Sequence, residues 1–406
     1  MPSKVYFANI SKIRLRGIVL QIDDLFEQAD FRSVISEGDS VAIKIHTGDE
    51  YNNMTMRPGF IRRVVENVKK LGGHPFVTDA TQLYCIAKFT SAGFIDAAAT
   101  NGFAFSTLGC PVVVADGPGI TWANPMNCED VTLPIPDGDR LKDIEIASAF
   151  VRADAMIVCA RLSPAPDRRS ILKHIGMGCA SKRGKARIHA IVKPKVVTAK
   201  CTGCELCLDY CAWDAIEIVQ GKAKINYTKC HGCQICCTAC SRGGGGGLAD
   251  KIPLKKGGGI QRQIDVVDAA AALIRQKTGK IGYLGFLIDY EDECENWCKR
   301  PMFPDIGVLA SKDPVALDAA GYDLIAKAPF LPWSEADNLP PEADKIESWH
   351  CGETKFKWEE QLKEAERLKL GTRKYELVEI DASGSKYDYR ELPGFLGRVP
   401  HSLKKK

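Results

Sequence analysis

Eight cysteines in two matching runs constrain this chain more than any other feature. Residues 201–211 read CTGCELCLDYC and residues 230–240 read CHGCQICCTAC, so each run has the spacing C-x2-C-x2-C-x3-C. A four-iron cubane takes three thiolates from one tight turn and a fourth from elsewhere in the chain. Zinc prefers two cysteine pairs per metal, usually with histidine or a longer gap between them. The spacing therefore predicts two [4Fe-4S] clusters, with zinc or a relic of a former metal site as the alternatives.

The surroundings of these runs resemble the bacterial two-cluster ferredoxin domain over residues 195–242. Residues 213–218 alternate like a strand, Gln220 and Gly221 can turn the chain, and residues 223–227 can return as the hairpin partner. In such ferredoxins the fourth cysteine of each run binds the other cluster. The resemblance therefore implies two ligand sets. They are Cys201, Cys204, Cys207 and Cys240, and Cys230, Cys233, Cys236 and Cys211.

Two departures from the ferredoxin pattern concern the surroundings of the clusters. Ala212 and Ser241 follow the last cysteine of each run, where these ferredoxins usually carry proline. This difference bears on the environment and potential of the clusters more than on ligation. Cys237 is an additional thiol beside Cys236. It is either a competing ligand or a small buried side chain, and the second interpretation is favoured.

Composition sets the class of the protein and the compartment expected for it. A chain of 406 residues with 45% hydrophobic and 26% charged residues should form two or three ordinary globular domains. A net charge of +4 does not indicate any particular class of binding partner. Because there is no leader-like start and no apolar run of membrane length, we expect a cytoplasmic protein without a membrane span. Seventeen cysteines in such a chain favour metal ligation over disulfides.

Strands and helices alternate on both sides of the cysteine runs. The expected strands are residues 5–10, 39–46, 74–79, 112–115, 155–160, 280–289 and 305–309, and the expected helices are residues 20–34, 58–71, 261–276, 314–327 and 358–370. We therefore expect an α/β fold, with a parallel or mixed sheet in two halves and a small α+β two-cluster ferredoxin-like domain inserted between them. The predicted boundaries are 1–195 for the N-terminal half, 196–247 for the insert and 248–406 for the C-terminal half with an irregular charged tail.

Three of the predicted strands have polar carboxyl ends. Lys44, His46, Thr47, Gly48 and Asp49 lie at the end of the second strand, Asp79 and Thr81 at the end of the third, and Asp116 at the end of the fourth. In open α/β sheets, ligands gather at the carboxyl ends of strands. Lys44, His46 and Asp79 are therefore candidate site residues, although a polar loop after a strand is often only solvated.

The segment from Arg161 to Lys200 is strongly basic. It holds eleven lysines or arginines and a single acid, Asp167. Its stretch GMGCASKRGK has glycines that permit close backbone approach and cations that favour an anion. Lys173, His174, Cys179 and Lys185 are the candidates here. The partner is a small anionic substrate, a phosphate-bearing cofactor or the clusters themselves. Nucleic acid is not expected because no aromatic residues are interleaved with the basic ones.

Two further cysteines lie in an acidic loop after the strand at 280–289. Cys294 and Cys298 are four residues apart, and the stretch from Asp289 to Glu295 contains five acidic residues, including these two. Negative neighbours raise the pKa of a thiol, so these cysteines are not expected to act as free nucleophiles. They are expected to bind a further metal or cluster, with Cys179 as a candidate third thiol, or to form a redox pair. Ordinary structural cysteines are the alternative.

Several stretches resemble the domain-of-unknown-function family numbered 362, in its form with an inserted ferredoxin. They are VAIKIHTGDE at 41–50, LGGHPFVTDATQLY at 71–84, VVVADGPG at 112–119, GMGCASKRGK at 176–185 and DIGVLASKDPVALDAA at 305–320. The resemblance implies an α/β body with the insert, and little about biochemistry. Family members tend to show a stretch like His-Phe-Lys-Gly-His upstream of the GMGC run. Here residues 160–170 differ from it, and the substrate of this chain is expected to differ accordingly.

The leading hypothesis is a low-potential oxidoreductase. Electrons from a ferredoxin or similar redox partner would pass through the clusters to a site in the α/β body. That site would be built from Lys44, His46, Asp79, Lys173, His174, Cys179, Lys185 and the loop with Cys294 and Cys298. Histidine and lysine would serve as acid or charge clamp. Two other classes stay open, namely a non-catalytic electron-transfer subunit and a maturation factor that delivers a metal or cluster. No Gly-x-Gly-x-x-Gly fingerprint follows a strand, so direct use of a nicotinamide cofactor is not supported.

Overall fold

The computed structural model describes residues 2–12, 17–52, 55–163, 169–242, 248–249, 258–290, 301–334 and 358–380. An eight-stranded sheet forms the centre of the body. In spatial order its strands are β14 (Tyr375–Glu379), β1 (Ser3–Asn9), β13 (Gly307–Ser311), β12 (Ile281–Leu287), β7 (Ala155–Arg161), β2 (Ser40–Lys44), β3 (His74–Asp79) and β4 (Val112–Val114). Only β13 pairs antiparallel to its neighbours, so the sheet is mixed. The expectation of an α/β fold is confirmed.

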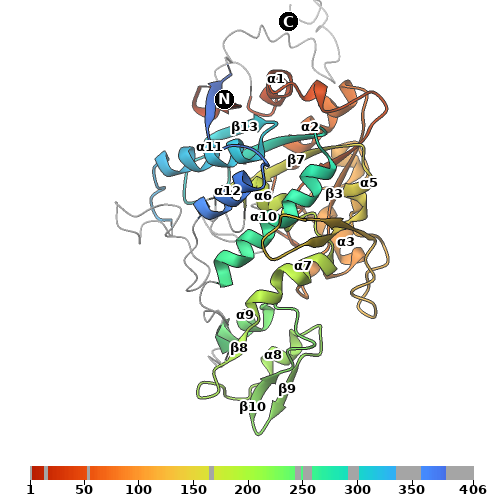
Figure 1. The fold of residues 1–406 in the computed structure, drawn as a ribbon, viewed down its shortest axis with the longest axis vertical. Coiled ribbons are helices and arrows are strands. Elements are labelled where there is room, and N and C mark those ends of the chain that lie inside the picture. Colours follow the sequence, from red (N-terminus) through yellow and green to blue (C-terminus); the bar gives the residue numbers. More distant parts are fainter. Residues whose placement is uncertain are drawn as a thin grey trace, which may run out of the picture.

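Helices cover both faces of this sheet (Figure 1). One face packs against α1 (Gln21–Gln28), α2 (Pro58–Lys70) and α4 (Phe105–Leu108), and the other packs against α6 (Ile171–Gly176), α10 (Gly258–Gln276), α11 (Pro314–Lys327) and α12 (Trp358–Arg367). Strand β7 shows how the two cores are divided. Ala155, Ile157 and Cys159 belong to the first core, while Met156 and Val158 belong to the second. This alternation follows from the two-residue period of a strand.

The remaining elements of the body lie around this sandwich. They are η1 (Ile10–Lys12), η2 (Phe31–Ser33), η3 (Ala87–Phe89), α3 (Ser91–Thr100), the hairpin β5 (Asp130–Pro134) and β6 (Asp143–Ala147), α5 (Ser148–Arg152), α7 (Lys182–His189) and η4 (Ala190–Val192). Helix α7 leads toward the cysteine-rich segment, which we define as residues 196–242.

The cysteine-rich segment lies at one end of the body (Figure 1). It contains α8 (Leu206–Asp209), the hairpin β9 (Ile216–Val219) and β10 (Lys222–Ile225), and α9 (Ile235–Arg242). At its two ends, β8 (Lys195–Val196) pairs with β11 (Leu248–Ala249). Its hydrophobic cluster is separate from the two cores of the body and consists largely of cysteines with a few small or branched side chains.

Most of the expected elements are present, with two differences. The helix expected over residues 20–34 ends at Gln28, because Asp30 adopts a left-handed conformation with φ of 54° and a short 3-10 turn follows. The region around residues 172–185, for which no secondary structure was predicted, forms the short helices α6 and α7. Ser170 and Ser181 start these helices by accepting backbone hydrogen bonds from Lys173 and Gly184.

Candidate functional site

The sheet changes its direction of winding between β2 and β7. From β2 the chain proceeds outward through β3 and β4, whereas from β7 it proceeds to β12 on the other side. Loops that follow these two strands therefore diverge and leave a crevice, which is where open α/β sheets bind ligands. His46 lies just beyond β2, and Arg161 is the last residue of β7.

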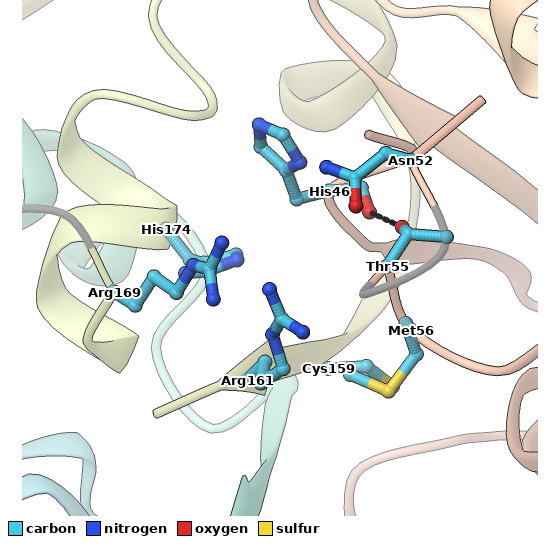
Figure 2. Close-up of a pocket in the computed structure, with 8 residues that line it drawn as sticks. All are labelled: His46, Asn52, Thr55, Met56, Cys159, Arg161, Arg169 and His174. Carbon is cyan, nitrogen blue, oxygen red and sulfur yellow. Dashed lines mark hydrogen bonds between the residues drawn. The ribbon is translucent and has the colours of Figure 1, made fainter. Parts of the chain in front are cut away.

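A cavity of about 380 Å³ lies at this position (Figure 2). Its described lining residues are His46, Asn52, Thr55, Met56, Cys159, Arg161, Arg169 and His174. In Figure 2 the guanidinium groups of Arg161 and Arg169 lie near each other at the centre of this group. Both arginines are buried, with relative exposures of 6% and 5%, and His174 is 4% exposed. We call this space the arginine cavity.

The two histidines of the arginine cavity hold their ring protons on different nitrogens. Nδ1 of His46 accepts a hydrogen bond from the backbone N–H of Gly48 at 3.1 Å. Nδ1 of His174 lies 3.0 Å from the carbonyl oxygen of Ser170, which can only accept, so this nitrogen donates. A neutral His46 thus carries its proton on Nε2, and a neutral His174 has a free lone pair on Nε2. The ring centroids are 6.4 Å apart.

Burial keeps both histidines neutral. It lowers the pKa of His46 well below its ordinary value, and the charges of Lys88 and Lys173 lower it further. Burial also lowers the pKa of His174 well below its ordinary value, and Lys44 and Lys173 add to the effect. The pair therefore offers one N–H donor and one acceptor, without adding charge to the cavity.

A second cavity of about 440 Å³ shares His46 with the first. We call it the lysine cavity. Its described lining residues are His46, Asp79, Ala80, Gln82, Leu83, Tyr84, Lys88, Lys173, Met177, Gly178, Lys185 and His189. These residues come from the loops after β2 and β3 and from the helices α6 and α7. The two cavities together make a cleft along the carboxyl edge of the sheet.

A buried ion-pair network forms the floor of the lysine cavity. Nζ of Lys44 lies 2.8 Å from Oδ1 of Asp79, and Nζ of Lys88 lies 3.5 Å from Oδ2. Burial works to raise the pKa of Asp79, but the charges of Lys44, Lys88 and Lys185 outweigh it and hold the pKa below its ordinary value. Asp79 is therefore ionised and forms ion pairs with both lysines inside the protein.

Lys185 has a lower pKa than an ordinary lysine. Its Nζ donates to the carbonyl oxygen of Thr81 at 2.6 Å. Burial lowers the pKa of Lys185 to about 8, although Asp116 and Asp79 act in the opposite direction. Asp116 itself accepts hydrogen bonds from the backbone N–H and the hydroxyl of Thr81, at 2.9 and 2.7 Å. Lys185 is charged at neutral pH and loses its charge a little above it.

Gly178 allows Lys44 to reach this network. A Cβ on Gly178 would lie 2.2 Å from the carbonyl oxygen of His174 and 2.9 Å from Nζ of Lys44. No side chain fits there, so the glycine in the GMGC run is needed for close packing of α6 against β2. Close backbone approach was expected from the sequence at the glycines of this run, and Gly178 shows it.

The structure brings together most of the residues that the sequence predicted. Lys44, His46, Asp79, Lys173, His174 and Lys185 all line the cleft or belong to its ion-pair network. Cys179 lies in the hydrophobic core, lines neither cavity, and has its pKa raised to about 12, chiefly by burial. Cys294 and Cys298 lie outside the described residues.

Four arginine, lysine or histidine residues of the cleft were not singled out from the sequence. Arg161 and Arg169 were counted only as part of the basic segment, and Lys88 and His189 were not singled out. The position of Arg161 at the end of a strand was the one signal that could have identified it. Lys88 and His189 reach the cleft through long-range packing, which the sequence pattern does not reveal.

Each of the two implied cysteine sets lines its own cavity. One cavity of about 310 Å³ is lined by Cys201, Cys204, Cys207 and Cys240, together with residues of the first run and the hairpin. Another of about 310 Å³ is lined by Cys211, Cys230, Cys233 and Cys236, together with Pro194 and Trp213. We call these the outer and the inner cysteine cavity. Among the described residues, no three His, Cys, Asp or Glu side chains come close enough to hold a single metal ion.

The thiols of each set influence one another. Burial raises the pKa of Cys207 to about 11, and Cys236, Cys201 and Cys240 raise it as well. Burial raises the pKa of Cys233 to about 12, with Cys236, Cys230 and Cys211 adding to it. Backbone amides point at two sulfurs, from Ala223 to Cys201 at 3.3 Å and from Ala215 to Cys211 at 3.4 Å. Crowded, buried thiols of this kind ionise readily only when they bind a metal.

The inner cysteine cavity adjoins the cleft. The ring of Trp213, which lines that cavity, lies 5.7 Å from the ring of Phe89, next to Lys88 of the lysine cavity. A Cβ on Gly232 would lie 2.4 Å from the carbonyl oxygen of His189, another lysine-cavity residue. Sγ of Cys85 donates to the carbonyl oxygen of Tyr210 at 2.7 Å. We call this contact region the junction.

The fold defines an α/β protein with a cleft at a switch point of its sheet and a cysteine-rich segment beside that cleft. The sequence profile of the family described as "Domain of unknown function (DUF362)" matches residues 41–323. The chain belongs to this family. No curated protein matches it. None of the helices in the described part of the chain is long and apolar enough to cross a membrane.

Proposed function

We propose that this protein is an iron–sulfur oxidoreductase, which passes low-potential electrons through two [4Fe-4S] clusters to a substrate in the cleft. One cluster would be held by Cys201, Cys204, Cys207 and Cys240, and the other by Cys211, Cys230, Cys233 and Cys236. When bound, clusters of this type supply and accept single electrons. The electron donor would be a ferredoxin-type protein, and the setting would be the cytoplasm.

The cysteine geometry supports clusters over zinc. Four cysteines line each cavity in the crossed arrangement of two-cluster ferredoxins. A single zinc ion needs four ligands drawn tightly around one point, and no such group occurs among the described residues. A cluster is larger than one ion and separates its ligands, which suits cavities lined by cysteines on several sides.

The junction is the observation that favours an enzyme over a simple electron carrier. A simple carrier needs only an exposed cluster, whereas here the inner cysteine cavity adjoins a cleft rich in titratable side chains. Trp213 and Phe89 on one side, and Gly232 and His189 on the other, connect the two spaces. Electrons and substrate would thus meet in the lysine cavity.

The histidines of the cleft would orient the substrate through hydrogen bonds. Nε2–H of His46 would donate to an atom of the substrate that gains negative charge, and Nε2 of His174 would accept from a donor group of the substrate. Lys173 and Lys185 would stabilise negative charge that develops on the substrate. Lys44 and Asp79 would hold the floor of the cavity in place.

The proposal is tested with anaerobically purified full-length protein reduced by dithionite. It is mixed with pools of small reducible anions, such as 2-oxo acids, enoates and nitro-carboxylates, and reoxidation is followed by visible absorbance. We expect at least one pool to support many turnovers. His46→Gln should lower the rate by about 10²- to 10³-fold, the range typical of a lost hydrogen-bond donor to developing negative charge, while the spectrum of the reduced protein stays unchanged.

Two other results would favour the rival functions. Reversible reduction with no turnover in any pool would indicate a non-catalytic electron-transfer subunit. Transfer of iron to an apo-ferredoxin on mixing would indicate a maturation factor. An unchanged rate in His46→Gln, with turnover present, would remove the cleft from the mechanism.

A further inference from the structure

A buried indole N–H borders the inner cysteine cavity. Trp213 lines this cavity and lies two residues after Cys211. Its Nε1 atom is buried, and none of the described residues accepts a hydrogen bond from it. An indole nitrogen can only donate, and buried donors in folded proteins nearly always have an acceptor. This donor therefore needs an acceptor that the folded chain alone does not provide.

Two rings hold this indole in place. The ring of His231 lies 4.4 Å from that of Trp213 with an interplanar angle of 77°, and the ring of Phe89 lies 5.7 Å from it at 67°. Both contacts are edge-to-face, a favourable arrangement that orients an aromatic side chain. The ammonium group of Lys182 lies 3.8 Å from the centre of the ring of Phe89 and holds that ring in turn. The direction of the N–H is therefore set by packing.

Sulfur is the acceptor that the inner cysteine cavity offers. Its described lining consists of apolar side chains, Trp213, Gln234 and four cysteines. Nε2 of Gln234 donates to the backbone carbonyl oxygen of Val192 at 2.6 Å, so this amide is engaged with the chain. A thiol sulfur accepts weakly, whereas ionised groups accept stronger, charge-assisted hydrogen bonds. The negatively charged sulfurs of a bound cluster would thus satisfy the indole N–H.

The outer cysteine cavity has no equivalent buried donor side chain among its described lining residues. Apart from the cysteines, its polar side chains are those of Thr202 and Glu205, and both residues are exposed. Backbone amides do not distinguish the two sets, because one points at a sulfur of each set, at 3.3 and 3.4 Å. The indole N–H of Trp213 is therefore a difference between the two sites that acts on the inner one.

We propose that Nε1–H of Trp213 donates a hydrogen bond to a sulfur of the cluster held by the inner cysteine cavity, and thereby raises the reduction potential of that cluster. Reduction adds one electron and one negative charge, and a hydrogen-bond donor stabilises the more negative state. No bond of Trp213 breaks, and its proton stays on the indole. An electron is thus favoured at the cluster beside the cleft. The inference rests on the proposed function in one respect only, namely that a [4Fe-4S] cluster occupies this cavity.

The experiment is a redox titration of the anaerobically purified, full-length protein, followed by electron paramagnetic resonance. Trp213→Phe removes the N–H and keeps an aromatic ring. We expect one of the two cluster potentials to fall, because the reduced state loses about threefold to tenfold in relative stability, which is about 28–59 mV for one electron. The other potential should not move. The sign is diagnostic, because water that entered beside the smaller ring would stabilise the reduced state and raise the potential.

Trp122→Phe is the matched control. It also removes an indole N–H next to Phe89, whose ring lies 4.7 Å from that of Trp122. However, Trp122 is 66% exposed and lines neither cysteine cavity. Both potentials of this variant should equal those of the wild type.

A second measurement detects the hydrogen bond in the wild type itself. Protein with ¹⁵N in its indole groups is reduced and studied by pulsed electron paramagnetic resonance, which detects a nucleus that is hydrogen-bonded to a paramagnetic cluster. We expect an indole coupling in the wild type that is retained in Trp122→Phe and lost in Trp213→Phe. Because the wild type alone gives the signal, the test stays decisive if Trp213→Phe does not retain its cluster.

Four results separate the outcomes. A potential that stays the same or rises in Trp213→Phe, or a wild type without an indole coupling, would overturn the hydrogen bond and leave the proposed function standing. The same fall in Trp213→Phe and Trp122→Phe would also overturn it. A fall confined to Trp213→Phe, with no turnover of any reducible anion, would uphold the hydrogen bond and count against the enzyme. Protein without four-iron clusters would overturn both.

Discussion

The α/β body and the cysteine-rich segment are held together by different means. The body encloses two large apolar cores, and strands β7, β12 and β13 are buried along their whole length. The segment has fewer than 50 residues, and its small cluster consists mostly of cysteines with a few side chains such as Ile216 and Ile225. Domains of this size rarely fold on apolar burial alone. We therefore expect the body to be stable through its own cores, whereas the proposed clusters would stabilise the segment.

The largest expected effect separates the two regions by removing one thiol. Cys233→Ser should abolish iron binding at the inner cysteine cavity and raise amide hydrogen exchange across residues 211–236 by roughly 100-fold or more, because metal binding there is also folding free energy. Exchange in β7, β12 and β13 should not change. Cys237→Ser is the matched control, because Cys237 is buried in the same segment but lines neither cysteine cavity. Equal effects of the two variants would contradict the ligand assignment.

The second prediction disturbs only the body. Asp79→Asn leaves Lys44 and Lys88 buried without their carboxylate, and it should lower the free energy of unfolding by about 3–5 kcal/mol in urea titrations. Asp39→Asn breaks the more exposed pair with Lys280 and should cost at most about 1 kcal/mol. If both substitutions lower the free energy of unfolding by the same amount, the buried ion-pair network does not stabilise the floor of the cleft.

The third prediction concerns pH and the helix that carries Lys173 and His174. Asp318 is fully buried on α11 and accepts from the backbone amides of Ile171 and Leu172 at 2.8 and 3.1 Å. Burial raises its pKa to about 7. The folded state therefore holds a proton that the unfolded state releases near pH 4. The contribution to stability is complete below that pH and is lost as pH rises through about 7.

This effect is measured as the slope of unfolding free energy against pH. Asp318→Asn should remove a fall of up to roughly 4 kcal/mol between pH 4 and 7. Asp323→Asn, at an exposed position of the same helix, should leave the slope unchanged. A wild-type slope retained in Asp318→Asn would show that this carboxyl does not titrate in that range.

The smallest expected effect tests the junction. Gly232 and Gly221 both have positive φ, of 75° and 70°, so alanine strains the backbone equally at the two sites. Only at position 232 would the new Cβ meet the body, at the carbonyl oxygen of His189, while nothing lies within 4 Å of the Cβ at 221. Gly232→Ala should therefore weaken local protection at the junction by about 1–3 kcal/mol more than Gly221→Ala. The same exchange in both variants would mean that the segment and the cleft are not coupled there.

The sequence predicted the α/β fold well because its strands are unusually clear. Residues 281–287 and 155–160 are apolar runs bounded by turns, and Pro58 and Asp313 mark helix starts. It missed β14, since Tyr375–Glu379 is a charged edge strand whose place is set by pairing with β1. The helix predicted over residues 20–34 is too long, because the spacing of apolar residues does not reveal the left-handed conformation of Asp30 that follows its end.

The sequence predicted only the part of the site that lies near strand ends. Lys44, His46 and Asp79 lie at or just after strand ends, where the rule about ligand sites applies. Arg169, Lys88 and His189 lie further beyond the strand ends, so their place in the cleft depends on how the loops and helices pack, which no local pattern records. The cysteine sets were predicted from spacing, and the assignment of clusters to them stays a prediction.

Iron and acid-labile sulfide per chain, measured on anaerobically purified protein, test the central claim most directly. The account predicts about eight of each, as two four-iron clusters require, with loss of about half in Cys233→Ser and no loss in Cys237→Ser. About twelve of each would mean a further cluster elsewhere in the chain. Zinc in place of iron, or iron without sulfide, would contradict the account and remove electron transfer from the proposed function.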